Sequence, residues 1–258
     1  MVIAVDIGNT NIVFGFFVQG QLENTLRITT DSGRTSDEYR LILEQFINSE
    51  NLKDGVEDFL ISSVVPPLTP IFRAVARKFS CKEPILIAAD LPLGIEFDIS
   101  EPKLTGTDRI CDIFEAHKMF PKENVVVIDF GTATTFSVVT KDGKFIGGPI
   151  SVGIIPASTE LFRKTSQLPR IELTKPQSAI GKNTVEEMQS GIVNGFGGLV
   201  DKLVDLVEKE LGEKVRVIAT GGISQIMEGV SERIEIFDKL LTIKGLYSIY
   251  EYIRQPAR

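Results

Sequence analysis

The pattern Asp-x-Gly occurs twice in this sequence, each time between two apolar runs. The first copy, Asp6-Ile7-Gly8-Asn9, lies between two apolar runs within residues 1–17. The second copy, Asp129-Phe130-Gly131-Thr132, lies between apolar runs within residues 124–139. Short apolar runs that are bounded by small polar residues predict buried strands. We therefore expect two hairpins, each with a carboxylate at the end of its first strand.

Hairpin tips of this composition suit a triphosphate. Glycine removes the side chain that would block a phosphate, and exposed N–H groups and hydroxyls can donate to its oxygens. A carboxylate repels phosphate, so it has to act through a cation. One such tip alone is equally an ordinary hairpin with a polar end. Because the two copies lie about half a chain apart, they indicate two related halves with a nucleotide in the cleft between them.

Composition narrows the class of protein. A net charge of −7, with no compensating run of Lys and Arg, argues against non-specific binding to nucleic acid. No apolar run approaches the roughly 20 residues that a membrane helix needs. The sequence enters a strand without a signal-like segment, and Cys81 and Cys111 form no disulfide or zinc pattern. We expect a cytoplasmic protein, without a membrane partner, in which both cysteines are buried thiols.

The order of the expected elements mixes hairpins with helical crossovers, which predicts an α/β fold with mixed sheets. We place a domain boundary near residue 119 and expect domains over 1–119 and 120–258. Capping-box patterns begin at Thr35 and Thr184. Besides the two hairpins, we expect helices over 35–47, 68–79, 110–119, 158–165, 184–211 and 243–253, and strands over 22–28, 58–65, 84–88, 144–150 and 215–219.

Common phosphate-binding signatures are missing from the sequence. It has no G-x-x-x-x-G-K-[ST]. The glycine motif of dinucleotide-binding proteins leads into a helix, whereas both glycine tips here lead into strands. Paired Asp-Gly hairpins with a distal Gly-Gly tip are the arrangement of the superfamily of sugar kinases, actin and heat-shock ATPases. Within it, the chain resembles the type III pantothenate kinases over nearly its whole length. The matching motifs are Asp6 to Thr10, Gly106 to Arg109, Asp129 to Thr135, Gly181 to Thr184 with Gln189 to Gly191, and Ala219 to Gly222.

The resemblance implies a fold and an activity. The fold would be two ribonuclease-H-like (actin-like ATPase) domains with mixed sheets and an interdomain nucleotide cleft. The activity would be transfer of the γ-phosphoryl group of ATP to the hydroxyl of pantothenate, giving 4'-phosphopantothenate, the first step of coenzyme A biosynthesis. The family also implies a homodimer with the acceptor pocket near the subunit interface.

The motif Gly106-Thr107-Asp108-Arg109 carries the implied acceptor site. By resemblance, Asp108 is the base beside the pantothenate hydroxyl, and Arg109 pairs with the pantothenate carboxylate. Residue chemistry alone leaves alternatives. A carboxylate in the first turn of a helix is favourable to the helix dipole, and an arginine there is often a surface residue. Thr184 is the family's substrate-contacting threonine and equally a helix N-cap. Phe97 lies where the family places an aromatic residue, although it is also suited to core packing.

The resemblance also assigns the phosphate and cation sites. Asp6 would act through Mg²⁺ on the β- and γ-phosphates, and Ile7, Gly8, Asn9, Thr10 and Asn11 complete that ATP-binding segment. Thr132 would hold phosphate from the second tip. Asp129 would bind the monovalent cation, K⁺ or NH₄⁺. The single histidine, His117, lies away from every motif and is interpreted as structural.

Two departures from the family pattern leave alternatives open. Ser137 stands where the family has an aspartate, which removes a carboxylate near the phosphates. Residues 147–153 read Gly-Gly-Pro-Ile-Ser-Val-Gly, where the family carries Gly-Gly-x-Ile-x-Pro-Gly. One alternative is a superfamily kinase for another small acid or a sugar. The other is a nucleotide-binding accessory protein of the same family, which Ser137 favours.

Overall fold

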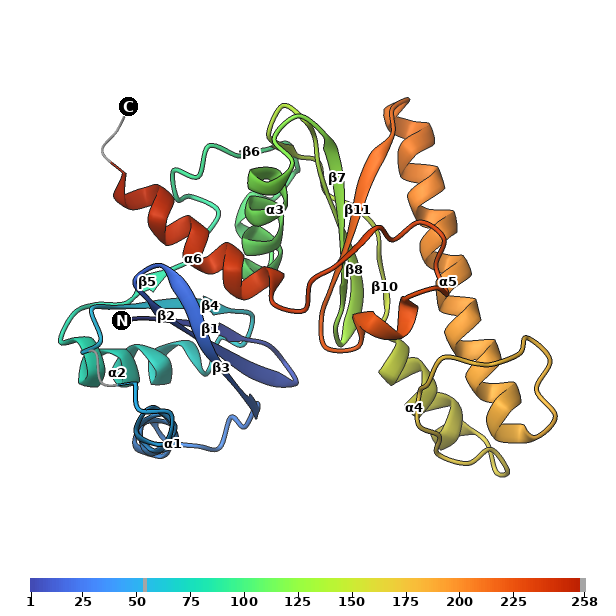
Figure 1. Ribbon diagram of the computed structural model, residues 1–258, viewed down its shortest axis with the longest axis horizontal. Coiled ribbons are helices and arrows are strands. Elements are labelled where there is room, and N and C mark those ends of the chain that lie inside the picture. The colour runs from blue at the N-terminus through green and yellow to red at the C-terminus, as the bar shows by residue number, and fades with distance from the viewer. Residues whose placement is uncertain (53–54, 256–258) are drawn as a thin grey trace. The chain divides into compact units, whose positions relative to one another are not determined.

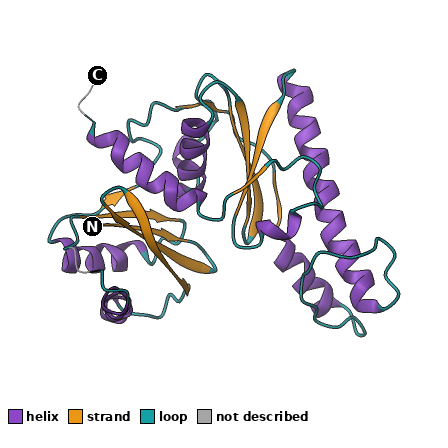
Figure 2. Ribbon diagram, viewed as in Figure 1, coloured by secondary structure: helices purple, strands orange, loops and turns teal. Residues whose placement is uncertain are grey.

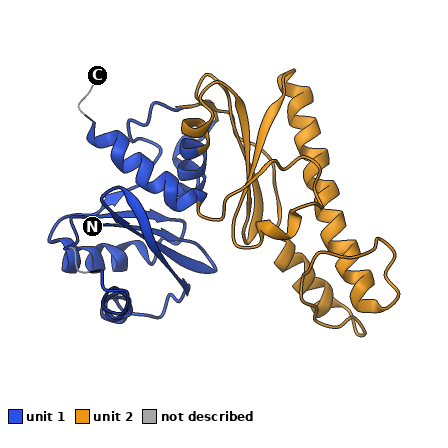
Figure 3. Cartoon of the chain, viewed as in Figure 1, with its two compact units in different colours: residues 1–95, 100–115, 241–258 blue, residues 96–99, 116–240 orange. Residues whose placement is uncertain are grey.

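The computed structural model of the chain describes residues 1–52 and 55–255. The chain forms two compact units that are discontinuous in sequence (Figure 3). The first contains residues 1–95, 100–115 and 241–258, and the second contains residues 96–99 and 116–240. The domain division at residue 119 stays a prediction.

The first unit is built on a five-stranded mixed sheet with the strand order β3-β2-β1-β4-β5. β1 pairs antiparallel with β2 and parallel with β4, so the first Asp-x-Gly tip joins two antiparallel strands as predicted. Figure 1 labels the elements of this unit, which are β1 (Val2–Ile7), β2 (Asn11–Val18), β3 (Gln21–Thr29), α1 (Ser36–Ser49), β4 (Asp58–Ser63), α2 (Thr69–Ser80), β5 (Ile85–Leu86), η1 (Pro102–Leu104), most of α3 (Thr107–Met119) and α6 (Leu241–Arg254).

Apolar packing on both faces buries the first sheet. On one face, Tyr39 of α1 and Phe72 of α2 pack together with ring centroids 4.7 Å apart, and Phe14 of β2 lies 5.9 Å from Phe72. On the other face, Tyr247 of α6 stacks on Phe17 at 4.0 Å. The sheet is therefore the middle layer between α1 and α2 on one side and α6 on the other (Figure 2). Thr35 and Glu38 form the predicted capping box of α1.

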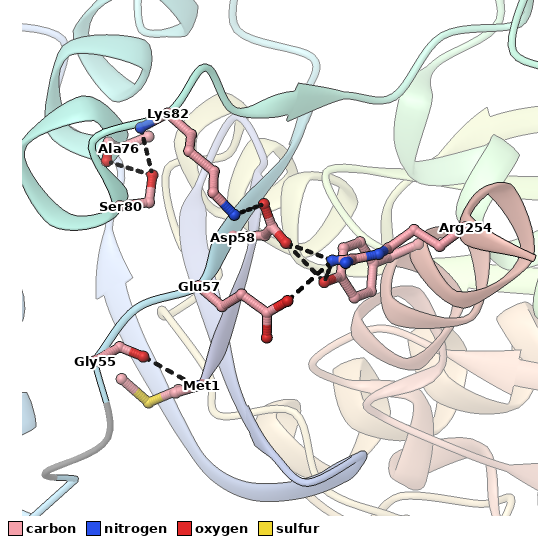
Figure 4. Close-up of polar contacts among 9 residues, drawn as sticks. Met1, Gly55, Glu57, Asp58, Ala76, Ser80, Lys82 and Arg254 are labelled. Carbon is pink, nitrogen blue, oxygen red and sulfur yellow. Dashed lines mark hydrogen bonds and ion pairs between the residues drawn. The ribbon is translucent and has the colours of Figure 1, made fainter.

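Polar contacts attach α6 to the first residue of β4 (Figure 4). Asp58, the first residue of β4, accepts a hydrogen bond from Tyr250 Oη at 2.8 Å and from Arg254 Nη1 at 2.6 Å. Lys82 Nζ approaches the other Asp58 oxygen at 3.3 Å. The hydrogen bond to Asp58 and desolvation raise the pKa of Tyr250, with desolvation the larger cause. These contacts hold the last helix on the first unit although the whole of the second unit precedes it in sequence.

The second unit contains a seven-stranded mixed sheet. Its order is β12-β11-β7-β8-β9-β6, and β10 pairs with β8. β7 pairs antiparallel with β8 and parallel with β11. The long helix α5 packs on this sheet (Figure 1). The elements are β6 (Glu96–Phe97), β7 (Asn124–Phe130), β8 (Ala133–Val139), β9 (Lys144–Phe145), β10 (Ile150–Val152), α4 (Ile154–Lys164), α5 (Thr184–Leu211), β11 (Val215–Thr220), η2 (Ser224–Met227) and β12 (Ile236–Phe237).

The two sheets share a strand framework. The order β3-β2-β1-β4-β5 of the first corresponds to β9-β8-β7-β11-β12 of the second, with the same parallel and antiparallel pairings among the first four strands of each series. The predicted relation between the two halves therefore has a structural counterpart, and the prediction of two mixed α/β sheets is confirmed.

Several element boundaries differ from those predicted. The strand expected over 144–150 is divided into β9 and β10, because Gly147 and Gly148 between them have φ values of 90° and 144°. Helix α4 begins at Ile154 instead of Ser158. Pro156 is accommodated in its first turn, where a backbone N–H has no intrahelical partner. The expectation that both cysteines are buried is wrong for Cys81, which ends α2 in a left-handed conformation and is exposed.

Helix α5 differs from prediction at its start. Its N-cap is Asn183, whose Oδ1 accepts the Glu186 N–H at 3.1 Å. Thr184 is consequently the first helical residue, so the prediction that it caps the helix is wrong. Within α5, a Cβ at Gly197 would lie 2.8 Å from Val230 Cγ1, which explains one of the four glycines by close packing. Across the described residues, no helix combines the length and the apolar character needed to cross a bilayer.

Candidate functional site

The first Asp-x-Gly tip is a tightly closed hairpin. Gly8 N–H donates to the Asn11 carbonyl at 3.0 Å, and Thr30 donates from Oγ1 to the Gly8 carbonyl at 2.6 Å. Asn9 and Thr10 are exposed at the tip, whereas Ile7 is buried beneath it. A Cβ at Gly8 would lie 3.0 Å from the Asn11 carbonyl oxygen. The Gly8 N–H is used to close the turn. Glycine is favoured here because it has no side chain to crowd the Asn11 carbonyl.

A chain of hydroxyl groups joins the Asp6 carboxylate to the motif at residues 106–109. Ser62 Oγ donates to Asp6 Oδ1 at 2.8 Å and lies 3.0 Å from Thr107 Oγ1. The Ser63 N–H donates to Thr107 Oγ1 at 2.8 Å. Two predicted motifs that are about 100 residues apart in sequence are thus brought together in the first unit, and Ser62 is the side chain between them.

Asp108 lies at the start of α3, immediately after Thr107. The Arg109 N–H donates to Asp108 Oδ1 at 2.7 Å. A Cβ at Gly106 would overlap that oxygen, so a larger residue there would displace the carboxylate from this position. Desolvation raises the pKa of Asp108, against the opposing effects of the Arg109 N–H and the Arg109 charge. A carboxylate with a raised pKa is a better proton acceptor than an ordinary aspartate.

Arg109 is half-buried beside two carboxylates. Desolvation lowers its pKa, while the charges of Asp108 and Asp112 act in the opposite direction. Arginine remains charged in proteins despite such shifts. The arrangement therefore keeps a cation next to the predicted base, where an anionic acceptor would be attracted.

The second tip also joins two antiparallel strands, but its turn is one residue shorter, since Phe130 pairs with Thr134 whereas Ile7 pairs with Ile12. Gly131 N–H donates to the Ala133 carbonyl at 3.0 Å, and Thr132 is exposed. Gly153 packs so closely on the tip that a Cβ would overlap the carbonyl oxygen of Thr132. Gly221, with φ +92°, lies against Asp129, and a Cβ there would overlap Asp129 Oδ1. Two glycines from distant segments therefore enclose this tip.

Thr220 stands opposite Asp129 in the parallel pairing of β11 with β7. Its side chain is 1% exposed, and Oγ1 has no hydrogen-bond partner among residues 1–52 and 55–255. An unpaired buried hydroxyl is costly, so it calls for a specific explanation. Ser137 is also buried and lies on the Asp129 face of the sheet, because it pairs with Val127 two residues away.

Other predicted site residues lie apart from these contacts. Phe97 of β6 packs edge-on against Phe145 with ring centroids 5.8 Å apart, which agrees with its core-packing alternative. Thr184 is exposed at the start of α5. Desolvation lowers the pKa of His117, whose Nδ1 has no hydrogen-bond partner in the part of the chain that the structure describes.

The predicted site residues divide between the units. The first unit holds the residues from Asp6 to Asn11 and from Gly106 to Arg109, and the second holds Phe97, Asp129, Thr132 and Thr184. Within the described residues no group of three or more His, Cys, Asp or Glu side chains is arranged to hold a metal ion.

Sequence reasoning missed Ser62 and did not single out Thr220. Each lies at the carboxyl end of a buried strand and stands opposite a tip aspartate only through a parallel pairing. The available signal was a hydroxyl residue at the carboxyl end of an apolar strand, repeated in both halves of the chain. Parallel strands bring their carboxyl ends to one edge of the sheet, so this signal can be used.

Comparison with known proteins gives a consistent result. A family model described as type III pantothenate kinase matches residues 2–206. The chain is 39% identical to a type III pantothenate kinase of Roseiflexus sp. (strain RS-1), covering 98% of this chain and 100% of the relative. It is 40% identical to a type III pantothenate kinase of Desulfatibacillum aliphaticivorans, covering 98% of this chain and 99% of the relative.

Solved structures bear on the fold alone, because their sequences are less similar. A Campylobacter jejuni protein described as a Baf family transcriptional activator aligns with a TM-score of 0.60 at 20% identity, covering 97% of this chain and 98% of that one. A ROK hexokinase of Thermus thermophilus aligns with a TM-score of 0.51 at 14% identity, covering 98% and 99%. These neighbours confirm the predicted actin-like ATPase fold.

Proposed function

The chain belongs to the type III pantothenate kinase family, and we propose that Asp108 is the base of its reaction. The protein is an ATP-dependent phosphotransferase that phosphorylates pantothenate in coenzyme A biosynthesis. Family membership therefore favours the kinase over the two alternatives, an accessory protein and a kinase for another small acid or sugar. The residue roles that follow are proposals.

The observation that carries the proposal is the connection of Asp6 to the Asp108 motif through Ser62 and Thr107. Phosphoryl transfer needs an aligned hydroxyl, a proton acceptor and neutralisation of the phosphate charge. Asp108 accepts the proton of the pantothenate hydroxyl as the oxygen attacks the γ-phosphorus. The bond from the γ-phosphorus to the bridging oxygen breaks, and ADP leaves with its electron pair. The raised pKa of Asp108 supports this role.

The first tip is proposed to hold ATP. Asn9, Thr10 and Asn11 would contact phosphate oxygens, which the exposure of Asn9 and Thr10 supports, and Thr132 remains a predicted phosphate contact. Asp6 fits Mg²⁺, since this ion is commonly bound by one or two carboxylates together with substrate phosphates. When bound, Mg²⁺ neutralises charge on the β- and γ-phosphates.

A monovalent cation is proposed at Asp129. The buried Thr220 hydroxyl, which has no hydrogen-bond partner among the described residues, supports an oxygen-rich site beside this carboxylate. Gly221 adds to that support, because a Cβ there would fill the space next to Asp129 Oδ1. K⁺ and NH₄⁺ suit such a site, as both are held by oxygen atoms.

The acceptor is proposed to bind at the start of α3. Arg109 would pair with the pantothenate carboxylate, while Gly106 and Thr107 shape the loop that carries Asp108. Thr184 and Phe97 remain predicted substrate contacts from the second unit. A cytoplasmic location and the absence of a nucleic-acid partner also stay predictions.

A homodimer is proposed, and exposed apolar side chains support it. Ile150 and Val152 of β10 and Ile155 at the start of α4 are each more than half exposed. Contiguous exposed apolar groups are typical of surfaces that bind another protein. We expect light scattering to report a dimer for the natural chain and a monomer for Ile155→Glu. Leu41→Glu, at an exposed position on α1 in the first unit, is the matched control and should remain dimeric.

The proposed base is tested by pantothenate-dependent release of ADP in the presence of Mg²⁺ and K⁺. Loss of a general base should lower kcat by about 10²–10⁴ in Asp108→Asn. Asp37→Asn is the matched control, because Asp37 is likewise in the first turn of a helix but outside the site. If Asp108→Asn had the same kcat as the natural chain, another group would have to accept the proton.

A further inference from the structure

Ser62 is a buried hydroxyl for which the family motifs give no role. It is the next-to-last residue of β4 and stands directly opposite Asp6 in the parallel pairing with β1. Its side chain is 0% exposed, yet Oγ lies within hydrogen-bond distance of both Asp6 Oδ1 and Thr107 Oγ1. It therefore contacts no solvent and connects two functional motifs.

The direction of the hydrogen bonds follows from the number of hydrogens. An ionised carboxylate can only accept, so Ser62 gives its single hydrogen to Asp6. Thr107 must then donate its own hydroxyl hydrogen to Ser62 Oγ, while Thr107 Oγ1 accepts from the Ser63 N–H. The order of donation in this relay is therefore Thr107 to Ser62 to Asp6, and the buried Cys111 side chain also hydrogen-bonds with Ser62.

We propose that Ser62 is a positioning residue that sets the spacing between Asp6 and the loop carrying Asp108. The inference rests on the roles proposed above for those two aspartates. In-line phosphoryl transfer depends on the distance between the phosphate and the acceptor hydroxyl, and a misplacement of about 1 Å can cost about 10²-fold in rate. Asp6 lies on the phosphate side and Asp108 on the acceptor side, and Ser62 is the buried hydroxyl of the relay between them.

A serine that merely fills the core would contribute to stability alone. The alternatives therefore differ in what Ser62→Ala changes. A core serine predicts a lower free energy of unfolding with unchanged kinetics. A positioning residue predicts, in addition, a lower kcat and weaker binding of Mg²⁺ with ATP, because Asp6 has lost the donor that orients it.

The test uses the full chain and compares four proteins. For Ser62→Ala we expect kcat to fall about 10- to 100-fold and the Kd of ATP with Mg²⁺, measured by calorimetry, to rise about 5-fold. Ser62→Cys keeps the side-chain shape with a weaker donor and should lie between Ser62→Ala and the natural chain. The matched control is Ser231→Ala, since Ser231 is also buried and donates to a carboxylate, Asp201, at 2.6 Å in the second unit.

The outcomes separate this inference from the proposed function. Natural kcat and natural affinity for ATP with Mg²⁺ in both Ser62 variants would overturn the positioning role. Equal kinetic losses in Ser231→Ala would also overturn it, because the effect would then be one of general stability. If the natural chain itself released no ADP in response to pantothenate, the proposed function would fail instead.

Discussion

The Asp6 tip and the Asp129 tip lie on corresponding strands, and one difference between them is the hydroxyl group on the neighbouring parallel strand. Opposite Asp6, Ser62 donates to the carboxylate at 2.8 Å. Opposite Asp129, Thr220 stands in the same parallel register, and its buried hydroxyl has no hydrogen-bond partner among the described residues. The same framework therefore presents one carboxylate that accepts a hydrogen bond from the neighbouring strand and one beside a hydroxyl that has no hydrogen-bond partner among the described residues.

The glycines near the two tips also differ in their effect. At the first tip, a Cβ at Gly8 would approach only the Asn11 carbonyl, at 3.0 Å. At the second, Gly221 and Gly153 come from distant segments and leave no room for a Cβ. The second tip is therefore shaped by the packing of three segments, whereas the first is shaped mainly by its own turn. We infer that the first tip tolerates local change better than the second.

Exchange of each tip aspartate for asparagine tests the difference between the two carboxylates most strongly. Removal of one preorganised charge from a phosphoryl-transfer site should lower kcat by about 10²–10³. We expect that loss in Asp6→Asn at every K⁺ concentration, because its proposed partner is Mg²⁺. In Asp129→Asn we expect a loss that depends on K⁺. The measurement is ADP release over separate Mg²⁺ and K⁺ titrations.

The contrast between the two titrations is the informative result. Identical cation profiles for Asp6→Asn and Asp129→Asn would contradict the assignment of two different cations. The exposed Asp37→Asn variant serves as the control for the loss of one negative charge.

Gly221→Ala tests whether the second tip is as tightly enclosed as its contacts indicate. Alanine at φ +92° would be strained, and its Cβ would also lie 2.7 Å from the Phe130 carbonyl oxygen. We expect the free energy of unfolding in urea to fall by about 2–4 kcal/mol. Gly212→Ala is the control, because φ is +69° there and no described atom lies within 4 Å of a Cβ. Equal losses in the two variants would contradict the close packing at Asp129.

The two hairpin tips could be predicted because the chain encodes them locally. Apolar runs, a terminal aspartate and a following glycine define each one within about ten residues, and the capping box at Thr35 is similarly local. The small mistakes are also local. Asn183 and Thr184 are both good caps, and the backbone conformation at Asn183 decides between them.

Other features could not be predicted because they depend on pairing between distant segments. The role of Ser62 requires that β4 lie beside β1 with Ser62 opposite Asp6, and that Thr107 approach from another segment. Similarly, the amphipathic pattern of α6 predicts a buried face without identifying its partner. The contacts of Asp58 with Tyr250 and Arg254 place that helix on the first unit.

Thr220→Val tests the proposed role of the hydroxyl opposite Asp129. Valine has the shape of threonine and removes a buried unpaired hydroxyl, so we expect a gain in unfolding free energy of about 1 kcal/mol without K⁺. With K⁺, the natural chain should gain stability because the ion binds only the folded state, and the variant should gain less. Urea denaturation in buffers with and without K⁺ measures both effects.

Thr134→Val provides the control for that experiment. The Thr134 hydroxyl is also buried without a hydrogen-bond partner among the described residues, but it pairs with Phe130 and so faces the opposite side of the sheet from Asp129. Its removal should give a similar stability gain with a normal response to K⁺. A Thr220→Val variant that responds to K⁺ like the natural chain would contradict a cation site beside Asp129.

The dependence of stability and activity on pH gives a further, smaller difference between the two units. Desolvation raises the pKa of Asp108, so the folded chain retains this proton over a higher pH range than the unfolded chain. The resulting contribution to stability is present below the ordinary aspartate pKa and is lost as the pH rises through the raised value. We therefore expect Asp108→Asn to unfold at a higher temperature than the natural chain at neutral pH, although its kcat should be lower.

On the acid side of the pH–rate profile, we expect the loss of activity to reflect protonation of Asp108 in the first unit. Because the base must be ionised, kcat/KM of the natural chain should fall with an inflection above the ordinary aspartate value of 3.8. Asp129→Asn should retain that inflection at a lower rate, because its carboxylate accepts no proton from the substrate. The measurement is kcat/KM across pH at saturating K⁺, with unfolding followed in the same buffers. A shift of the inflection in Asp129→Asn would instead assign the acid side of the profile to the second tip.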